Sequence, residues 1–67
     1  MLYAVIFTNS REELVIKAIE APHEEKAIEW ILQAYSEEYE ENIDSLYVRT
    51  EAVEVESGKG IYHQNNR

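Results

Sequence analysis

The sequence predicts an α+β domain with the element order ββαβ(β), a two-layer sandwich in which one amphipathic helix covers one face of a mostly antiparallel sheet. Three observations lead to this fold class. A segment that is apolar on both faces opens the chain, a helical hydrophobic period fills its middle, and β-branched residues return after the helix. At 67 residues the chain is long enough for a single domain. We assign residues 1–63 to this domain and residues 64–67 to a flexible C-terminal tail.

The first two strands are predicted to form a hairpin. The segment from Leu2 to Thr8 is rich in β-branched and aromatic residues and runs into a turn at Asn9 and Ser10. Both faces of this strand are apolar, which is typical of a strand in the middle of a sheet. Residues 13–21 fit either a short strand or a helix. Their β-branched residues and the short connection before them favour the second strand of a hairpin.

The one long helix is predicted to begin at Pro22. A proline at the first helical position loses nothing by lacking an N–H group, and Glu24 and Glu25 follow where the helix dipole favours negative charge. At about 100° per residue, one stripe of the helix is apolar and the opposite side is polar. The apolar stripe consists of Ile28, Ile31, Leu32, Tyr35 and Tyr39. Trp30 lies between this stripe and the charged side, and we expect it to be half exposed.

The chain after the helix is predicted to return to the sheet. Residues 46–56 are predicted to form one long strand or two short ones, because their apolar alternation changes phase and a bulge near residues 50–52 reconciles the pattern. Residues 57–60 have the composition of a turn, and residues 61–63 are predicted to form a short edge strand. The resulting sheet has the strand order 2-1-3-4, with the first strand in a central position.

One helix covers only one face of such a sheet. The sequence pattern assigns the aliphatic face to the helix: Leu2, Ala4, Ile6, Leu14, Ile16, Ala18, Leu46 and Val48. The opposite face then carries Tyr3, Val5, Phe7 and Tyr47, and an apolar patch of this size is unusual on a monomer. We consider three interpretations: a homodimer through these four residues, cover by the C-terminal segment, or a stacking platform for nucleic-acid bases, which the charge of the chain opposes.

The chain is strongly acidic. Fourteen acidic residues against six basic ones give a net charge of −8, which repels nucleic acid and anionic membranes and favours basic protein surfaces. Eight carboxylates and one cation, Lys26, lie between residues 24 and 44. One interpretation is a solvated face that keeps the protein soluble. The other is imitation of a nucleic-acid backbone, with a contact set of Glu25, Glu29, Glu37, Glu40 and Glu41 and with Trp30 as an apolar anchor.

The sequence contains no pattern that indicates catalysis or a cofactor. The stretch that begins at His23 lacks the second histidine of a zinc helix, because the position that needs it is Ala27. Residues 57–60 lack the glycine spacing of a phosphate-binding loop, and the acidic cluster lacks the pattern of a calcium loop. We therefore expect no enzymatic activity, no metal and no cofactor. No apolar run is long enough for a membrane span and cysteine is absent, so we expect a cytoplasmic protein.

In size, acidic charge and element order, the chain resembles small phage-encoded inhibitors, including some anti-CRISPR proteins. The resemblance implies a protein that occupies a basic nucleic-acid channel or a protein–protein surface in the host cytoplasm. Together with the acidic helix, it predicts a non-catalytic module whose partner is a basic protein surface, such as that of a nucleic-acid-binding protein. The alternative is a structural or regulatory homodimer built through the exposed apolar face of the sheet.

Overall fold

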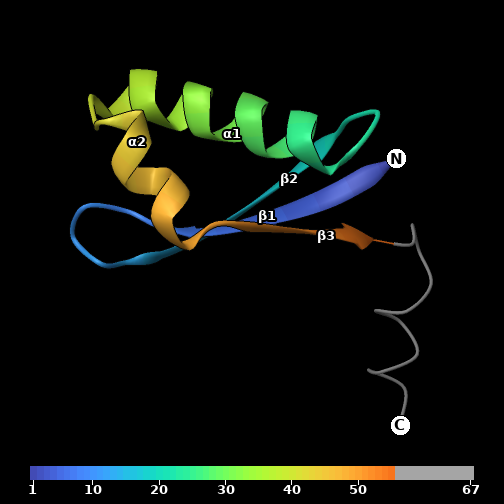
Figure 1. The fold of residues 1–67 in the computed structure, drawn as a ribbon, viewed down its shortest axis with the longest axis horizontal. Helices are drawn as coiled ribbons and strands as arrows, with labels where there is room; N and C mark the ends of the chain where they lie inside the picture. Colours follow the sequence, from blue (N-terminus) through green and yellow to red (C-terminus); the bar gives the residue numbers. More distant parts are fainter. Residues whose placement is uncertain (56–67) are drawn as a thin grey trace, which may run out of the picture.

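A computed structural model describes residues 1–55, which form a three-stranded antiparallel sheet with a helix across one face (Figure 1). The elements follow the order β1 (Leu2–Thr8), β2 (Leu14–Glu20), α1 (Glu24–Tyr39), α2 (Ile43–Leu46), the 3-10 helix η1 (Tyr47–Arg49) and β3 (Glu51–Val55). The strand order is β2-β1-β3, so the α+β class and the central position of β1 are confirmed. The predicted fourth strand at residues 61–63 and the tail at residues 64–67 lie outside the described residues.

Both neighbours of β1 pair with it in antiparallel fashion. The hairpin of β1 and β2 runs from the pair Leu2 and Glu20 to the pair Thr8 and Leu14, which confirms the strand interpretation of residues 13–21. On its other side, β1 pairs with β3 from Leu2 opposite Val55 to Ile6 opposite Glu51. Every strand–strand contact in the described residues therefore involves β1, and β2 and β3 are the edges of this sheet.

The long helix starts two residues later than the sequence predicts. His23 is the N-cap residue in an extended conformation, and α1 begins at Glu24, so Pro22 lies ahead of the helix. The prediction failed because proline also fits the connection before a helix, where no N–H donor is required of it. At the other end, Glu40 adopts a left-handed conformation with φ of 57° and its N–H donates to the carbonyl of Ser36, which closes the helix.

The segment between α1 and β3 is helical, which contradicts the prediction of a strand over residues 46–56. Asn42 starts α2, because its side-chain oxygen accepts a hydrogen bond from the Asp44 amide at 2.9 Å. Of the described part of this range, only residues 51–55 form a strand. The change of apolar phase that suggested a bulge marks instead the passage from η1 to β3 at Thr50, whose hydroxyl donates to the carbonyl of Leu46.

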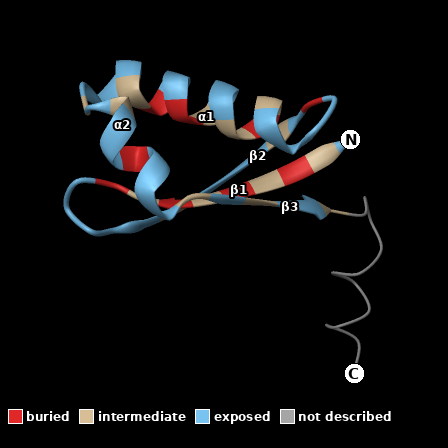
Figure 2. Cartoon of the chain, in the orientation of Figure 1, coloured by how far each residue is buried: buried red, intermediate tan, exposed pale blue. Residues whose placement is uncertain are grey.

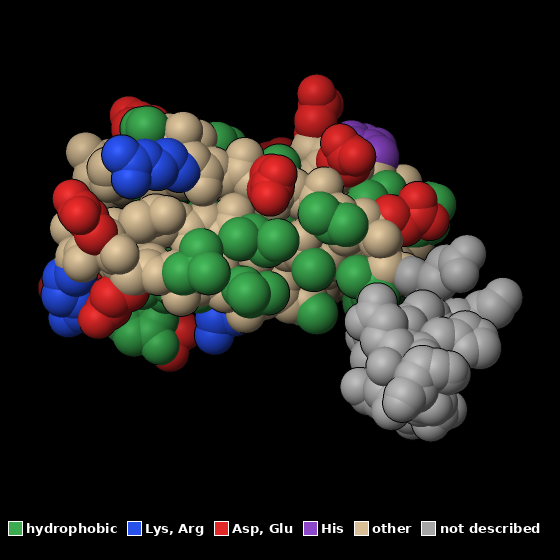
Figure 3. All heavy atoms as spheres, turned by 90° about the horizontal axis from the view of Figure 1, so that it is seen from below, with side chains coloured by type: hydrophobic (Ala, Val, Ile, Leu, Met, Phe, Trp, Pro, Cys, Tyr) green, Lys and Arg blue, Asp and Glu red, His purple; other side chains and the backbone are tan. Residues whose placement is uncertain are grey.

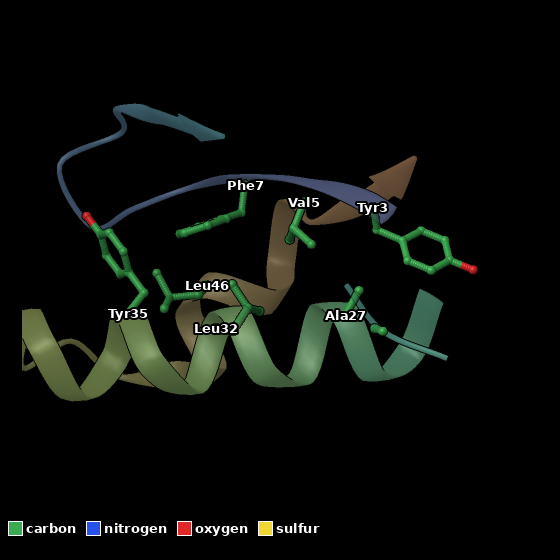
Figure 4. Packing of buried hydrophobic residues seen from close by; sticks show 8 residues of the cluster. Tyr3, Val5, Phe7, Ala27, Leu32, Tyr35 and Leu46 are labelled. Carbon is green, nitrogen blue, oxygen red and sulfur yellow. The ribbon is translucent and has the colours of Figure 1, made fainter. Parts of the chain in front are cut away.

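The core lies between β1 and α1. Figure 4 shows Tyr3, Val5 and Phe7 pointing from β1 toward the helix, and Figure 2 shows the alternation of buried and half-buried positions along this strand. The ring of Phe7 meets that of Tyr35 edge to face, with 5.0 Å between centroids and 82° between planes. The complete buried apolar set is Tyr3, Val5, Phe7, Ala21, Ala27, Leu32, Tyr35 and Leu46.

The two faces of the sheet are the reverse of those predicted. Tyr3, Val5 and Phe7, assigned to the exposed face by the sequence pattern, are 5%, 0% and 0% exposed beneath α1. Burial of two aromatic rings under the helix removes more apolar area from water than burial of the smaller residues at the even positions of β1. Tyr47 lies in η1 and not in the sheet. These four residues therefore do not form the predicted dimer surface.

Asn9 holds the turn between β1 and β2 and is the one buried polar residue among those described. Its side-chain oxygen accepts hydrogen bonds from the amides of Arg11, at 3.0 Å, and Glu13, at 2.8 Å. Its side-chain nitrogen donates to the Glu13 carboxylate at 2.9 Å and to the Tyr35 hydroxyl at 3.0 Å. One side chain thus closes the hairpin and ties it to α1.

The turn carries a pH-dependent contribution to stability. The hydrogen bond from Asn9, and after it the charge of Arg11, lower the pKa of Glu13 below its ordinary value of 4.5. A lowered folded-state pKa stabilises the fold above the unfolded-state pKa, and this contribution is lost as the pH falls through the folded-state pKa. We expect wild type to exceed Glu13→Gln in stability at pH 7 and the difference to shrink below pH 4.5 in urea titrations. A difference that is constant with pH contradicts this assignment.

Candidate functional site

The exposed side of α1 borders a shallow hollow of about 280 Å³ where the helix faces η1. Its lining combines two carboxylates with apolar and aromatic surface: Glu25, Ile28, Glu29, Tyr47 and Thr50. Glu25 and Glu29 are one helical turn apart and both exposed, Ile28 is half-buried, and Tyr47 is 44% exposed. The hollow therefore offers an apolar wall for a carbon chain and carboxylates for a positive charge.

The short helices fix the position of Tyr47. Leu46 is fully buried and anchors α2 in the core, and the next residue, Tyr47, starts η1 on the exposed side of that anchor. The cap at Asn42 and the hydrogen bond from Thr50 to Leu46 hold this segment at both ends. Tyr47 is thus presented by a segment with its own hydrogen bonds. Its ring is pre-positioned beside α1 rather than free in a loop.

The charges around the hollow are almost all negative. Lys26 forms an ion pair with Glu29, with 3.2 Å between Nζ and Oε1, and both groups are substantially exposed. An exposed pair of this kind contributes little and exchanges readily with other charges. Within the described residues Glu25 forms no ion pair. A cation from another molecule therefore meets one unpaired carboxylate and one that is weakly engaged.

The structure divides the predicted contact set into three groups. Glu25 and Glu29 border the hollow. Trp30, which is 43% exposed, and Glu37 lie about 20° apart around the helix, on the opposite flank from Ile28. The remaining two, Glu40 and Glu41, lie beyond the end of α1. The carboxylates of this contact set that lie within α1 therefore extend from Glu25 to Glu37, about 18 Å at about 1.5 Å per residue.

Glu41 has a structural contact of its own. Its carboxylate accepts a hydrogen bond from the backbone amide of Ser10 at 3.0 Å, and its carbonyl accepts one from the Ser36 hydroxyl at 2.6 Å. These bonds join the end of α1 to the β1–β2 turn. Glu41 is half-buried as a result, so it is less accessible to a partner than the carboxylates of the helix face.

Tyr47 is the residue of this site that the sequence analysis placed elsewhere. It was assigned to the sheet because residues 46–56 were interpreted as strand. The signal that would have located it is Asn42, a favoured N-cap residue ahead of Ile43 and Asp44, which predicts a short helix at this point.

The described residues show no arrangement typical of a metal centre or a membrane span. No group of three or more histidine, cysteine or acidic side chains in residues 1–55 is placed to hold a metal ion. In the same part of the chain, no helix combines the length and apolar character that crossing a bilayer requires. Comparisons with protein-family models, with curated proteins and with solved structures found no match.

Proposed function

We propose that the protein is a non-catalytic binding module that presents the outer face of α1 to a basic surface on a partner protein. The observation that carries this proposal is the hollow beside Tyr47, where Glu25 and Glu29 adjoin half-buried apolar surface. A lysine or arginine side chain of the partner fits such a place, because its carbon stem packs on Tyr47 and Ile28 while its charge meets the carboxylates.

The net charge of −8 supports the same kind of partner. A field of this sign steers basic surfaces toward the protein and raises their rate of association, with a strong dependence on ionic strength. A surface that binds a nucleic-acid backbone neutralises its phosphates with lysine and arginine, so a nucleic-acid-binding protein is the partner class we favour. Occupation of its phosphate-binding surface would make the module an inhibitor of the anti-CRISPR kind. Such an inhibitor acts in the cytoplasm, or in the host cytoplasm when it is encoded by a phage.

Charge reversal at one carboxylate tests this proposal. We expect Glu25→Lys to raise the dissociation constant of the captured partner at least tenfold, whereas Glu38→Lys, the same change on another side of the same helix, should alter it less than about threefold. The partner is captured from cell lysate on immobilised protein, and its affinity is then measured by calorimetry. For wild type, we expect binding to weaken markedly between about 50 and 200 mM salt.

Two results would contradict the proposal. If the affinity does not change with salt concentration, electrostatic attraction does not contribute to binding. Equal losses from Glu25→Lys and Glu38→Lys mean that only the total charge matters and that the hollow at Tyr47 is not the contact. Circular dichroism of both variants establishes that they remain folded, which is expected because both residues are exposed.

A further inference from the structure

The face of the sheet opposite α1 is apolar and open. It is formed by the even positions of β1 and β2 and the odd positions of β3: Leu2, Ala4, Ile6, Leu14, Ile16, Ala18, Val53 and Val55. Leu14, Ile16 and Val53 are 68%, 59% and 48% exposed. In Figure 3, which views the molecule from below, hydrophobic side chains gather across the middle of the surface, with charged groups toward its rim. Exposure of several large aliphatic residues side by side is unusual on a monomer.

The chain itself has little with which to cover this face. Helices α1 and α2 lie on the other side of the sheet (Figure 1), and η1 reaches only one end of the open face, where Val48 and Arg49 border a hollow with Ile6 and Leu14. Beyond residue 55 the sequence contains only two large apolar residues, Ile61 and Tyr62, among glycine, charged and polar ones. Two side chains are too few to cover eight apolar positions over three strands. Neither the described helices nor these two side chains therefore cover the whole face.

Charge on this face lies at its two ends. Glu20 lies at one end of β2, opposite Leu2, and Glu51 lies at the other end of β3, opposite Ile6. No lysine or arginine occupies a strand position on this side of the sheet. Arg49 of η1 borders a hollow with Ile6, Leu14 and Glu51, so its charge lies at the same end of the face as Glu51. The middle of the face carries no charge, and it therefore fits a partner that is flat, aliphatic and uncharged in the middle.

A second copy of the chain presents the same flat, aliphatic face, and the glutamates of the two copies do not lie opposite each other. A two-fold axis in the contact plane, either along the strands or across them, places Glu20 of one copy over Val55 or Leu14 of the other, and Glu51 over Ile16 or Val53. Like charges are thus never opposed at the corners. Both glutamates stay at the rim, where they keep access to water.

The size of the face fits a weak dimer. Three strands about 4.8 Å apart, at about 3.3 Å per residue, give a footprint on the order of 300 Å², and protruding side chains raise the accessible area above this value. Two copies then bury roughly 1,000 Å² in total, near the lower limit of specific interfaces. We propose that two copies of this chain pack through their open sheet faces as an aligned β-sandwich.

This dimer is independent of the proposed function. Face-to-face packing leaves both α1 helices on the outside, so the hollow beside Tyr47 is presented twice. Loss of dimerisation would leave the affinity of a single hollow unchanged, and reversal of Glu25 would leave the dimer intact. The two proposals can therefore fail separately.

Sedimentation of the full chain over a concentration range from about 5 μM to 1 mM tests the dimer. We expect wild type to approach the mass of two chains at the upper end. Ile16→Glu places a charge on the open face, next to Ile6 of the central strand, and should raise the dimer dissociation constant at least tenfold. Leu14→Ser is a second, milder variant of the same face. Trp30→Glu is the matched control, because it replaces an exposed apolar side chain on α1 and should dimerise as wild type does.

Isotope-filtered NMR on a mixture of labelled and unlabelled chains identifies the surface. We expect contacts between copies at the methyl groups of Ile16 and Val53. Three results overturn the proposal: a wild-type protein that is monomeric throughout, a dimer in which Ile16→Glu and Leu14→Ser associate as tightly as wild type, or a monomer in which these methyls contact residues 56–67 of the same chain.

Discussion

Replacement of Phe7 by alanine is expected to cost about 3–5 kcal/mol of unfolding free energy, because it removes a fully buried ring from the centre of the core. The ring contacts the edge of Tyr35 at a centroid distance of 5.0 Å, and this contact is lost with it. Domains are stabilised by roughly 0.05–0.15 kcal/mol per residue, or about 3–10 kcal/mol for a 67-residue chain, so the variant loses from about a third to all of its stability. Urea denaturation followed by circular dichroism should show a strongly lowered midpoint or a protein that is already unfolded without denaturant.

Ile16→Ala is the matched control for this variant. Ile16 lies on the open face and is 59% exposed, so its truncation leaves no cavity and should cost less than about 1 kcal/mol when measured on the monomer. A larger loss from Ile16→Ala than from Phe7→Ala would mean that the even positions of the strands face the helix. That result would restore the arrangement that the apolar pattern predicts and contradict the structure.

The order of the elements was predictable because it depends on local signals. The β-branched density of residues 13–21 identified a strand, and the apolar stripe through Leu32 and Tyr35 identified the face of α1 that is buried. The short helices were missed because α2 spans only residues 43–46, too short for any hydrophobic period. Its only signal is the cap residue Asn42.

Which face of the sheet packs against α1 was not predictable from the alternation of residues along the strands. Both faces of β1 are apolar, so the apolar pattern alone does not determine which face is buried. A charged residue does not mark the outer face here, because Lys17 lies on the helix side opposite Val5, at the edge strand, where it borders a hollow with Ile31 and Glu38. Its carbon stem can follow the apolar edge while its charge remains in water. The better signals were aromatic size and Asn9, which continues the inward positions of β1.

The candidate site was predictable in part, because some of its residues are placed by local sequence signals. Glu25 and Glu29 follow from helical periodicity, and the structure keeps them together on the exposed side of α1. Tyr47 joins these glutamates only in the folded chain, where η1 lies beside α1. Its position was not predicted, because the sequence of this segment was interpreted as a strand. The positions of the charges on one helix therefore follow from the local sequence, whereas the hollow beside them depends on the tertiary packing of α1 and η1.

Asn9→Ala is expected to cost about 2–4 kcal/mol, the second largest effect after loss of Phe7. The side chain makes four hydrogen bonds at a position that is 5% exposed, and the Tyr35 hydroxyl, which lies in the core, loses the donor it has there. The amides of Arg11 and Glu13 lose their acceptor as well. Because an unpaired buried group costs more than a hydrogen bond contributes, the loss exceeds that of an ordinary turn substitution.

Asn42→Ala is the control that separates the effect of burial from the effect of losing a local hydrogen bond to the backbone. Asn42 also accepts a hydrogen bond from an amide two residues later, that of Asp44, but it is exposed, so water replaces the lost acceptor and the cost should be about 1 kcal/mol. Thermal and urea denaturation of both variants measure the difference. Equal losses would mean that Asn9 acts only as a turn residue. A loss at Asn9 at least twice as large means that it links the β1–β2 hairpin to α1 through Tyr35, and Asn9→Asp should then fail to restore stability at pH 7, because a carboxylate cannot donate to the Glu13 carboxylate.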